Sequence, residues 1–401
     1  MAVAVLALVC LLMPLSQTVP LEKAAPAVPE TEGETILIRT VEELQRVLKG
    51  EPRRKTLLIA DGIYTLEAPA RMDKGGDVVI RSASGDPARA VLRGMGFFAG
   101  KPGDDLLQLG HVENVTIADL TFEECRSYGV KIEAERFPKN VHIRNCRFKN
   151  IGIRMIKGSS SREGRAVGGS IRYCRFENTL IPPADWLYEG DYISAIDMMS
   201  LEGWTIADNL FLNIKGRKGG ARGAIFIWVR SNNVIVERNA ILGCDRGVSF
   251  GNPSGSTNFV EGQEHIRDSV IRNNVIVPGP DAGIELWWAR NIGVYNNTVW
   301  REDAAGPGLR GGMSEWKIEG IRVVNNLVRG TNMLDGDVFQ ESNLFGDLAG
   351  CSLDWSRLAF LCGPEVAGMQ GKSLEEVQDD FNGKRRGRTP HIGAFERAEG
   401  P

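Results

Sequence analysis

Residues 203–251 read GWTIADNLFLNIKGRKGGARGAIFIWVRSNNVIVERNAILGCDRGVSFG. One phrase occurs twice in this stretch, because WTIADNLFLNIKG is echoed by VIVERNAILGCDRG, with Asn209 and Asn239 in matching places. Each phrase is typical of a short strand of alternating apolar residues, followed by a polar corner and a second strand such as AIFIW or GVSF. A segment that repeats itself in this way predicts one unit of a solenoid.

The same phrase recurs along most of the chain. One position in it forms a column that reads Leu120, Cys146, Cys174, Asn209, Asn239, Asn274, Asn297, Asn326, at intervals of 23 to 35 residues. Because the interval varies while the phrase is retained, insertions must fall in the turns and the strands must stack in register. Stacked strands are ~4.8 Å apart, a spacing that lets successive asparagine side chains hydrogen-bond in a ladder. The sequence therefore predicts an all-β fold of stacked parallel strands.

The ends of the chain are read differently from its middle. Residues 2–15 are apolar and predict the core of a secretory signal over residues 1–20, followed by a disordered linker over 21–34. The solenoid is expected over 35–345, with a capping helix between Thr40 and Gly50, and a capping segment over 346–401. Within the last segment, residues 373–381 suggest a short helix and residues 383–396 a turn and a final strand. Export to the periplasm or the exterior, without a membrane span after signal removal, is the expected outcome.

Composition and cysteine spacing limit the partners. A net charge of −3 leaves no domain-wide basic surface, which argues against nucleic acid as a partner. The cysteines form no CxxC pairs, so neither a zinc site nor a redox dithiol is indicated. Cys351 and Cys362 are close enough in sequence to bridge in an oxidising compartment, whereas Cys125, Cys146, Cys174 and Cys244 fit core positions. No linker divides the mature chain, and we expect a monomer.

The asparagine column, the early helix and the DGIYTL run at residues 61–66 resemble the right-handed parallel β-helix proteins of the pectate-lyase-like superfamily. DGIYTL and the run RSASGDPARAVLRG at residues 81–94 are similar to the N-terminal parts of chondroitinase-B-like and alginate-lyase-like proteins. The resemblance covers about residues 35–345 and implies a right-handed parallel β-helix with a short N-terminal capping helix. It implies no single reaction, because the fold carries lyases, hydrolases, epimerases and binding proteins. The aspartate cluster of polygalacturonases, the RxPxxR context of pectate lyases and the NGxExxR signature of the alginate-lyase-like proteins do not occur here.

The second strand of each repeat supplies the candidate site. Alternation along it predicts an outward row of Lys131, Arg154, Asp197, Phe226, Ser249 and Glu285, with Trp228 and Trp287 one outward step further on. Arg222 and Arg246 lie at the entries of two of these strands. The candidate catalytic residues are Lys131, Arg154, Arg222 and Arg246, and the candidate substrate-binding residues are Asp197, Trp228, Glu285 and Trp287.

These residue types suit a reaction on an acidic polysaccharide. A polysaccharide lyase needs a base for the proton beside a uronate carboxylate and a cation to offset that carboxylate. Lys131 could act as the base, the arginines could meet the carboxylate, and the tryptophans could stack on sugar rings. A structural interpretation stays open, in which Arg154 and Asp197 form a surface ion pair and the tryptophans pack beneath a loop. Asp197 and Glu285 are three rungs apart, so no metal site is predicted from them; no cofactor is predicted, and a role for calcium stays open.

The sequence thus favours an exported β-helix protein that acts on a uronic-acid polymer, by β-elimination as a polysaccharide lyase. A non-catalytic carbohydrate-binding or surface protein would use the same face. A glycoside hydrolase would need two carboxylates ~5 to 9.5 Å apart on that face. The sequence does not decide between these three functions.

Overall fold

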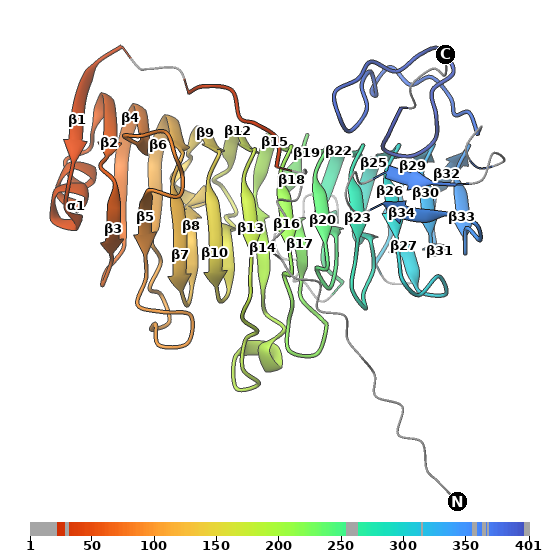
Figure 1. The fold of residues 1–401 in the computed structure, drawn as a ribbon, viewed down its shortest axis with the longest axis horizontal. Helices are drawn as coiled ribbons and strands as arrows, with labels where there is room; N and C mark the ends of the chain where they lie inside the picture. The colour runs from red at the N-terminus through yellow and green to blue at the C-terminus, as the bar shows by residue number, and fades with distance from the viewer. Residues whose placement is uncertain are drawn as a thin grey trace, which may run out of the picture.

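The structure, a computed structural model, describes residues 22–28, 32–253, 264–313, 316–354, 359–362, 366 and 369–396. Parallel strands stack side by side into a solenoid whose long axis is horizontal in Figure 1. One sheet of 22 strands and one of 11 strands form its walls. The larger sheet bends to give two faces, so each rung has three strands, one on each of three faces.

The strands of the three faces follow one another in the order face 1, face 2, face 3. Face 1 contains β1 (Glu34–Ile38), β2 (Arg53–Ile59), the later halves of β4 (Ala70–Ser82) and β6 (Leu107–Ala118), β9 (Lys139–Arg144), β12 (Ala166–Arg172), β15 (Leu201–Ala207), β18 (Ser231–Asn232), β19 (Ile235–Glu237), β22 (Ile266–Arg272), β25 (Ala289–Tyr295), β28 (Ile318–Glu319), β29 (Ile321–Val324) and β32 (Val338–Glu341). Face 2 contains β3 (Gly62–Thr65), β5 (Ala90–Arg93), β7 (Thr121–Cys125), β10 (Arg147–Ile151), β13 (Arg175–Glu177), β16 (Leu210–Leu212), β20 (Ala240–Leu242), β23 (Val275–Val277), β26 (Thr298–Trp300), β30 (Leu327–Arg329) and β33 (Leu344–Gly346). Face 3 contains the earlier halves of β4 and β6, then β8 (Tyr128–Ile132), β11 (Arg154–Gly158), β14 (Ser194–Met199), β17 (Gly223–Trp228), β21 (Val248–Phe250), β24 (Ile284–Leu286), β27 (Pro307–Gly311) and β31 (Thr331–Leu334).

The repeated phrase contains two strands, where the sequence suggested one. In the rung that opens the quoted stretch, β15 ends at Ala207 and β16 begins at Leu210. Between them Asp208 has a φ of 60°, a left-handed conformation that turns the chain from face 1 to face 2. Asn145, Asn273 and Asn325 hold the same place with φ values of 48°, 54° and 60°. The corner therefore falls inside the phrase, one residue before the column of asparagines.

The asparagine column forms a continuous chain of hydrogen bonds. Each Nδ2 donates to the Oδ1 of the next member at 2.9–3.1 Å, in the order Asn209, Asn239, Asn274, Asn297, Asn326, Asn343. The second amide proton donates to a backbone carbonyl of the preceding rung, as from Asn274 to Val236 at 2.9 Å. Asn343 extends the column beyond the last member found in the sequence. Every buried amide is thereby paired, which buried polar groups require.

Substitution inside this ladder should be more damaging than substitution at its end. Asn274→Ala removes the acceptor of the Asn239 side chain and backbone amides, 3.0 Å away, and the donor to Val236. We expect a loss of about 2–4 kcal/mol in the free energy of unfolding, measured in urea, because buried groups lose their partners. Asn343→Ala is the matched control at the half-buried end of the ladder, where water can replace the lost acceptor. Equal losses of unfolding free energy in the two variants would contradict the prediction that the buried ladder contributes to stability.

The interior is apolar and stacked in register. On face 2, Phe122, Phe148, Phe176 and Phe211 are stacked with ring centroids 4.7–5.0 Å apart. Cys125, Cys146, Cys174 and Cys244 are buried free thiols. The cysteines predicted to be core residues are therefore confirmed as such.

Helix α1 (Val41–Lys49) lies at the N-terminal end of the solenoid (Figure 1). Its N-cap is Thr40, whose side chain accepts a hydrogen bond from the backbone amide of Glu43 at 3.2 Å. Leu44 and Leu48 are buried beneath it. The predicted capping helix is confirmed in position and in boundaries.

The C-terminal segment 369–396 lies along the edge between faces 1 and 2. Asn273 Nδ2 donates to the Asp379 carbonyl at 2.7 Å, and Asn325 Nδ2 donates to the Lys372 carbonyl at 2.8 Å. Phe381 packs on the outer side of face 2. The helix suggested for residues 373–381 and the final strand are wrong, because these bonds to the solenoid hold the segment as turns and isolated bridges.

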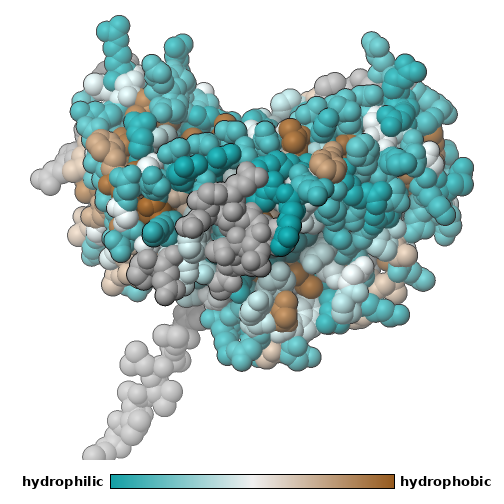
Figure 2. Space-filling model, turned by 180° about the vertical axis from the view of Figure 1, so that it is seen from behind, coloured by the Kyte–Doolittle hydropathy of each residue, from teal (hydrophilic) through white to brown (hydrophobic). Residues whose placement is uncertain are grey.

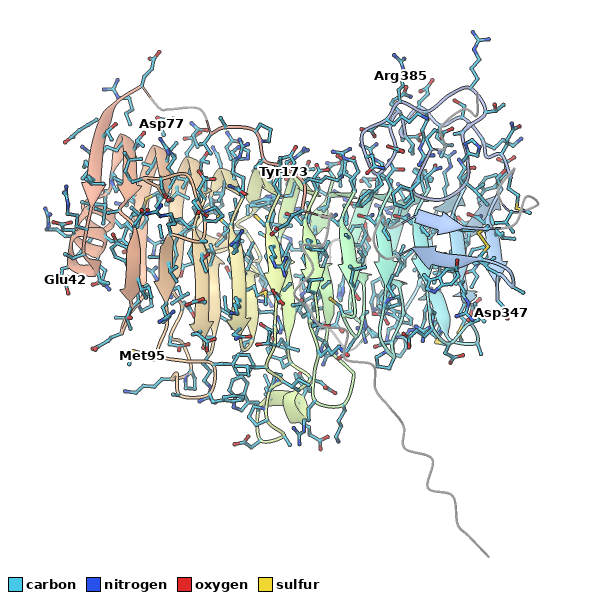
Figure 3. The ribbon with its side chains drawn as sticks, viewed as in Figure 1. Glu42, Asp77, Met95, Tyr173, Asp347 and Arg385 are labelled. Carbon is cyan, nitrogen blue, oxygen red and sulfur yellow. A yellow bond between two sulfur atoms is a disulfide. The ribbon has the colours of Figure 1, made fainter. Side chains whose placement is uncertain are left out.

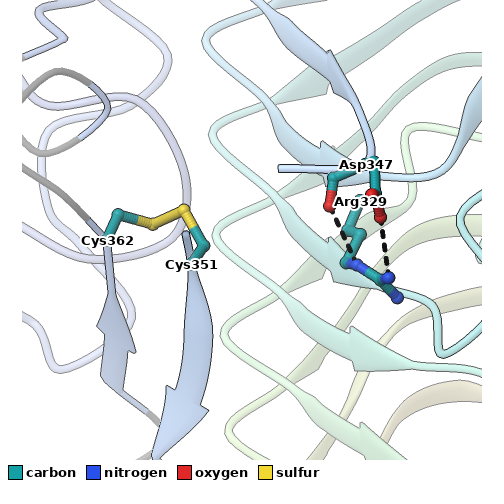
Figure 4. Close-up of a disulfide and its surroundings, with 4 residues drawn as sticks. All are labelled: Arg329, Asp347, Cys351 and Cys362. Carbon is teal, nitrogen blue, oxygen red and sulfur yellow. Dashed lines mark hydrogen bonds and ion pairs between the residues drawn. A yellow bond between two sulfur atoms is a disulfide. The ribbon is translucent and has the colours of Figure 1, made fainter. Parts of the chain in front are cut away.

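A disulfide joins Cys351 to Cys362, next to the antiparallel hairpin of β34 (Ser352–Asp354) and β35 (Ala359–Leu361). Figure 4 shows it beside the pair of Arg329 and Asp347. The bridge, which the sequence allowed but did not decide, is thus present.

The N-terminal end of the described chain is attached to the edge between faces 1 and 2. Lys23, which lies in the stretch that the sequence suggested as a linker, bonds Asp208 at 2.8 Å. The predicted signal segment lies outside the described residues. Within the described part of the chain, the helices lack the length and apolar character that crossing a membrane requires.

Candidate active site

The outward side of face 3 carries most of the candidate residues. Strand pairing places one residue of each rung in a single row, the outer column, which consists of Lys131, Lys157, Asp197, Phe226, Ser249, Glu285, Arg310 and Met333. The long loops 94–106, 178–193 and 213–222 enter face 3 from face 2 and project from the lower edge in Figure 1. Met95 marks this edge in Figure 3, and Tyr173 marks the opposite one.

Arg154 does not belong to the outer column, and Lys157 takes the place predicted for it. Arg154 pairs with Tyr128, whereas Lys157 pairs with Lys131 on one side and Asp197 on the other. The turn before β11 is as long as the turn before β8, because Ile151 pairs with Cys125. Matching GIRM to GVKI by their glycines therefore shifted the sequence alignment by three residues. Counting from the Cys125 and Ile151 column would have found Lys157.

Asp197 is the centre of a buried group of charges. Its Oδ2 accepts from Arg154 Nε at 2.5 Å and lies 3.1 Å from Lys157 Nζ. Its Oδ1 accepts from Trp228 Nε1 at 3.1 Å. The Arg154 and Asp197 side chains are both 0% exposed, so the interpretation of a surface ion pair is wrong. We call Arg154, Lys157, Asp197 and Trp228 the Asp197 cluster.

The guanidinium of Arg154 is held on several sides. Its Nη1 donates to the carbonyls of Ile153 at 2.8 Å and Tyr192 at 2.7 Å, and the group lies over the Tyr192 ring at 4.0 Å. Its Nη2 is buried without a hydrogen-bond partner among the described residues. Arg154 therefore holds the Asp197 carboxylate in place from the buried side, and a polymer on the surface cannot reach its guanidinium.

Burial and charge change the proton affinities in this cluster. Burial lowers the pKa of Lys157, and the attraction of Asp197 opposes this only in part. Burial alone would raise the pKa of Asp197, but Lys157 and Arg154 outweigh it and lower that pKa. A lysine that is neutral more readily than usual thus lies beside a carboxylate that stays ionised.

Lys131 lies one rung away and is more open to solvent. Its side chain is 27% exposed, and its Nζ is 3.6 Å from Glu133. Asp105 lies close by and accepts from Gln108 Nε2 at 2.7 Å. Burial raises the pKa of Asp105 to about 6, against smaller opposing effects of Gln108 and Lys131.

The raised pKa of Asp105 leads to a prediction about how stability depends on pH. The folded protein binds the Asp105 proton more tightly than the unfolded chain does, so stability should fall as pH rises from about 4 to about 6. Asp105→Asn should remove this dependence and raise the free energy of unfolding at pH 7 by up to about 3 kcal/mol, measured in urea. Asp104→Asn is the matched control, because Asp104 accepts from the Ser127 amide at 2.8 Å and its loss should not stabilise. A pH profile of Asp105→Asn like that of the wild type would exclude this assignment.

The other predicted residues lie together around one hollow, further along the column. Arg222, Arg246, Glu285 and Trp287 line a pocket of about 420 Å³, which we call the distal pocket. The rest of its lining consists of Pro253, Pro307, Arg310, Met313, Trp316 and Met333. The eight candidate residues therefore divide between the region of the Asp197 cluster and the distal pocket.

Two arginines and two carboxylates neutralise one another in the distal pocket. Arg246 Nη1 lies 2.8 Å from Glu285, and Arg246 also bonds Asp281. Arg310 Nη2 lies 2.6 Å from Asp281 and bonds Glu285 as well. Burial would raise the pKa of Asp281, but the two arginines outweigh it and lower that pKa. Ser249 completes the group by donating to Glu285 at 2.9 Å.

Arg222 differs from these two arginines. It lies over the Tyr188 ring at 4.8 Å and forms no ion pair with a described residue. Burial lowers the pKa of Arg222, and the charges of Arg246 and Arg154 lower it further. Its charge is therefore available to an anion in the pocket.

The two tryptophans are less open than the sequence suggested. Trp228 is half-buried and stacks on Phe226 with centroids 5.2 Å apart. Trp287 is 3% exposed and meets Trp316 edge-on at 5.4 Å. Trp287 lines the distal pocket, whereas Trp228 contacts Asp197 and Phe226.

Several residues of both regions were missed from the sequence. Lys157 was missed because the sequence alignment put Arg154 in its place in the outer column. Arg310 was missed because it lies on β27, which the comparison of second strands did not include. Asp281 and Trp316 lie in turns, where no period predicts a position. Within the described residues, no group of three or more His, Cys, Asp or Glu side chains is arranged to hold a metal ion.

Solved structures share this architecture. Pectate lyase Pel9A aligns with a TM-score of 0.54 over 88% of this chain and 90% of its own, at 11% sequence identity. This chain folds as a parallel β-helix, the fold of that pectate lyase. An alginate lyase from Paenibacillus sp. str. FPU-7 aligns with a TM-score of 0.49 over 77% of this chain and 99% of its own, at 17% identity. At such identities the likeness concerns the fold. No protein-family model matches the chain, and no curated protein is similar to it in sequence.

Proposed function

We propose that this β-helix protein is a polysaccharide lyase that cleaves a uronic-acid polymer by β-elimination. The observation that carries the proposal is Lys157, a lysine of lowered pKa beside the ionised Asp197, in the outer column of face 3. The fold is that of the pectate lyase described above. The side shown in Figure 2 is largely hydrophilic with scattered apolar patches, a surface that suits a polar polymer.

The residues in and beside the outer column can each take one role in the elimination. The neutral amine of Lys157 would take the proton at C5, next to the carboxylate. The electron pair of that bond would form the C4=C5 double bond as the C4–O bond breaks, and the leaving oxygen would take a proton from water. Lys131, which the sequence suggested as the base, would offset the carboxylate charge from the adjoining rung. Arg154 would act through Asp197 as a positioning residue.

The test is direct. The purified protein is incubated with polygalacturonate, alginate, hyaluronan and chondroitin sulfate, with and without calcium, and the absorbance of the unsaturated product is followed. A product from at least one polymer is expected. Absence of product from all four, under both conditions, would overturn the lyase assignment.

The two alternatives are separated by the site and by the same assay. Asp281 and Glu285 approach one another, since Arg310 Nη2 bonds both. A hydrolase needs one carboxyl of raised pKa. The lowered pKa of Asp281 does not fit that role, whereas burial raises the pKa of Asp105 to about 6, so the assay separates a hydrolase that uses Asp105 from the lyase, because hydrolysis leaves no unsaturated product. A non-catalytic binding protein would retain a polymer without forming product. We also propose that the chain is exported as a monomer, and the disulfide supports an oxidising compartment.

A further inference from the structure

The distal pocket lies away from the proposed catalytic lysine. Glu285, on the pocket's floor, is three rungs or ~14 Å from Asp197 at the usual strand spacing, whereas Arg222, at the entry of β17, is on the rung next to Asp197. Its walls come from both edges of face 3. Arg222 and Pro307 belong to one edge, and Pro253 and Trp316 belong to the other.

The charges that the described residues bring to this pocket do not balance. Arg222, Arg246 and Arg310 contribute three positive charges, while Asp281 and Glu285 contribute two negative charges. Arg246 and Arg310 are occupied by the two carboxylates, so the unmatched charge is that of Arg222. A half-buried unmatched guanidinium favours a single carboxylate as its ligand.

A second group in the pocket also lacks a partner. Trp287 is 97% buried, since only 3% of its surface is exposed, and its Nε1–H has no acceptor among the described residues. Burying a donor without a partner is costly, and most such donors in proteins bond to something. A hydroxyl or carboxylate oxygen of a ligand in the pocket would supply the missing acceptor.

The remaining lining is apolar and partly exposed. Met313 and Met333 are 40% and 42% exposed, and Trp316 stands edge-on to Trp287. Such walls suit the C–H face of a sugar ring. An inorganic anion would leave them uncovered, so the lining favours a sugar that bears a carboxylate.

We propose that the distal pocket is a subsite for a uronate residue remote from the bond that is cleaved. Arg222 binds its carboxylate, the Trp287 N–H donates to one of its oxygens, and the methionines cover its ring. This proposal rests on the proposed function and refines it. The enzyme then selects polymers whose acidic residues recur along the chain, and short fragments that reach only the Asp197 cluster are poor substrates.

Two substitutions test the subsite. Arg222→Met should raise KM for the polymer cleaved by the wild type about 10- to 100-fold, because a hydrogen bond to a charged group is lost. Trp287→Phe keeps an aromatic ring but removes the five-membered ring with its N–H, and it should raise KM about 3- to 10-fold. Neither change should alter KM for fragments too short to reach the pocket. Arg222→Lys, which keeps the charge, should recover part of the loss.

The controls separate this proposal from the proposed function. Arg329→Met removes an arginine that lies over Trp300 on face 2, away from the groove, and should leave KM unchanged. Thermal unfolding establishes that each variant is folded, and calorimetric titration with the same polymers measures binding without turnover. If the wild type cleaves a polymer while Arg222→Met and Trp287→Phe bind it with unchanged affinity, the subsite is overturned and the lyase stands. If the wild type binds a uronate polymer without product and Arg222→Met weakens that binding, the subsite stands and the lyase fails. If no uronate polymer binds, both fail.

Discussion

Asp197→Asn should lower the free energy of unfolding by about 3–5 kcal/mol, the largest loss of stability that we expect from one substitution. Among the described residues, Asp197 is the one carboxylate paired with Arg154 and Lys157, whose side chains are 0% and 10% exposed, and the change removes its charge. The asparagine could still accept one hydrogen bond, but Arg154 cannot lose its proton and would remain a buried charge without a counter-ion. Urea unfolding measures the effect.

A control on the adjoining face separates burial from ion pairing as such. Glu202 lies 3.8 Å from Arg165, and its side chain is 45% exposed. Glu202→Gln should change stability by less than about 0.5 kcal/mol, because exposed ion pairs contribute little. Replacing Arg154, Lys157 and Asp197 together by Met, Met and Leu should recover much of the stability lost in Asp197→Asn. A loss in Asp197→Asn no larger than in Glu202→Gln would refute the buried cluster.

Lys157→Met should reduce kcat/KM on the responsive polymer by about 10²–10⁴-fold, the loss typical of a missing general base. In the wild type, kcat/KM should rise with pH through the pKa of Lys157, which burial places below the usual lysine value of 10.5. This rise should be absent from the residual activity of Lys157→Met. The product absorbance, recorded across pH, measures both effects.

The matched control is another lysine of the same solenoid. Lys149 is exposed on face 2, outside the groove, and Lys149→Met should keep full activity. If Lys157→Met also keeps it while Lys131→Met loses it, the base is Lys131 and the assignment of roles is reversed. Retained activity in both variants would remove the two lysines from the chemistry.

The fold could be predicted because its determinants are local and repeated. Asn209 and Asn239 occupy the same place in each phrase, and a side chain that bonds its own copy in the next rung leaves a pattern in the sequence. The same regularity located face 3 and its inward apolar residues. One rung was misaligned because a glycine was taken as the start of a strand, while the pairing of Ile151 with Cys125 sets that start.

The site was predicted only in part because its contacts cross rungs. Asp197 meets Arg154 and Trp228, which are 43 and 31 residues away. No spacing rule connects such residues, since the intervening loops have unrelated lengths. Whether a charged side chain is buried also depends on those loops, and the sequence therefore suggested an exposed ion pair at Arg154. The distal pocket could not be predicted because Pro253 and Trp316, which lie in turns, and Pro307, at the start of β27, complete its lining.

The C-terminal segment changes how the solenoid can open. In a stack of rungs each unit touches only its neighbours, so an end can fray one rung at a time. Here the segment bonds Asn273, Asn296 and Asn325, which belong to successive rungs. Peeling away the rung of Asn325, next to the last one, must break contacts of a segment that also holds the two rungs before it. These rungs therefore share one opening free energy, and the half of the groove that contains the distal pocket behaves as a single cooperative unit.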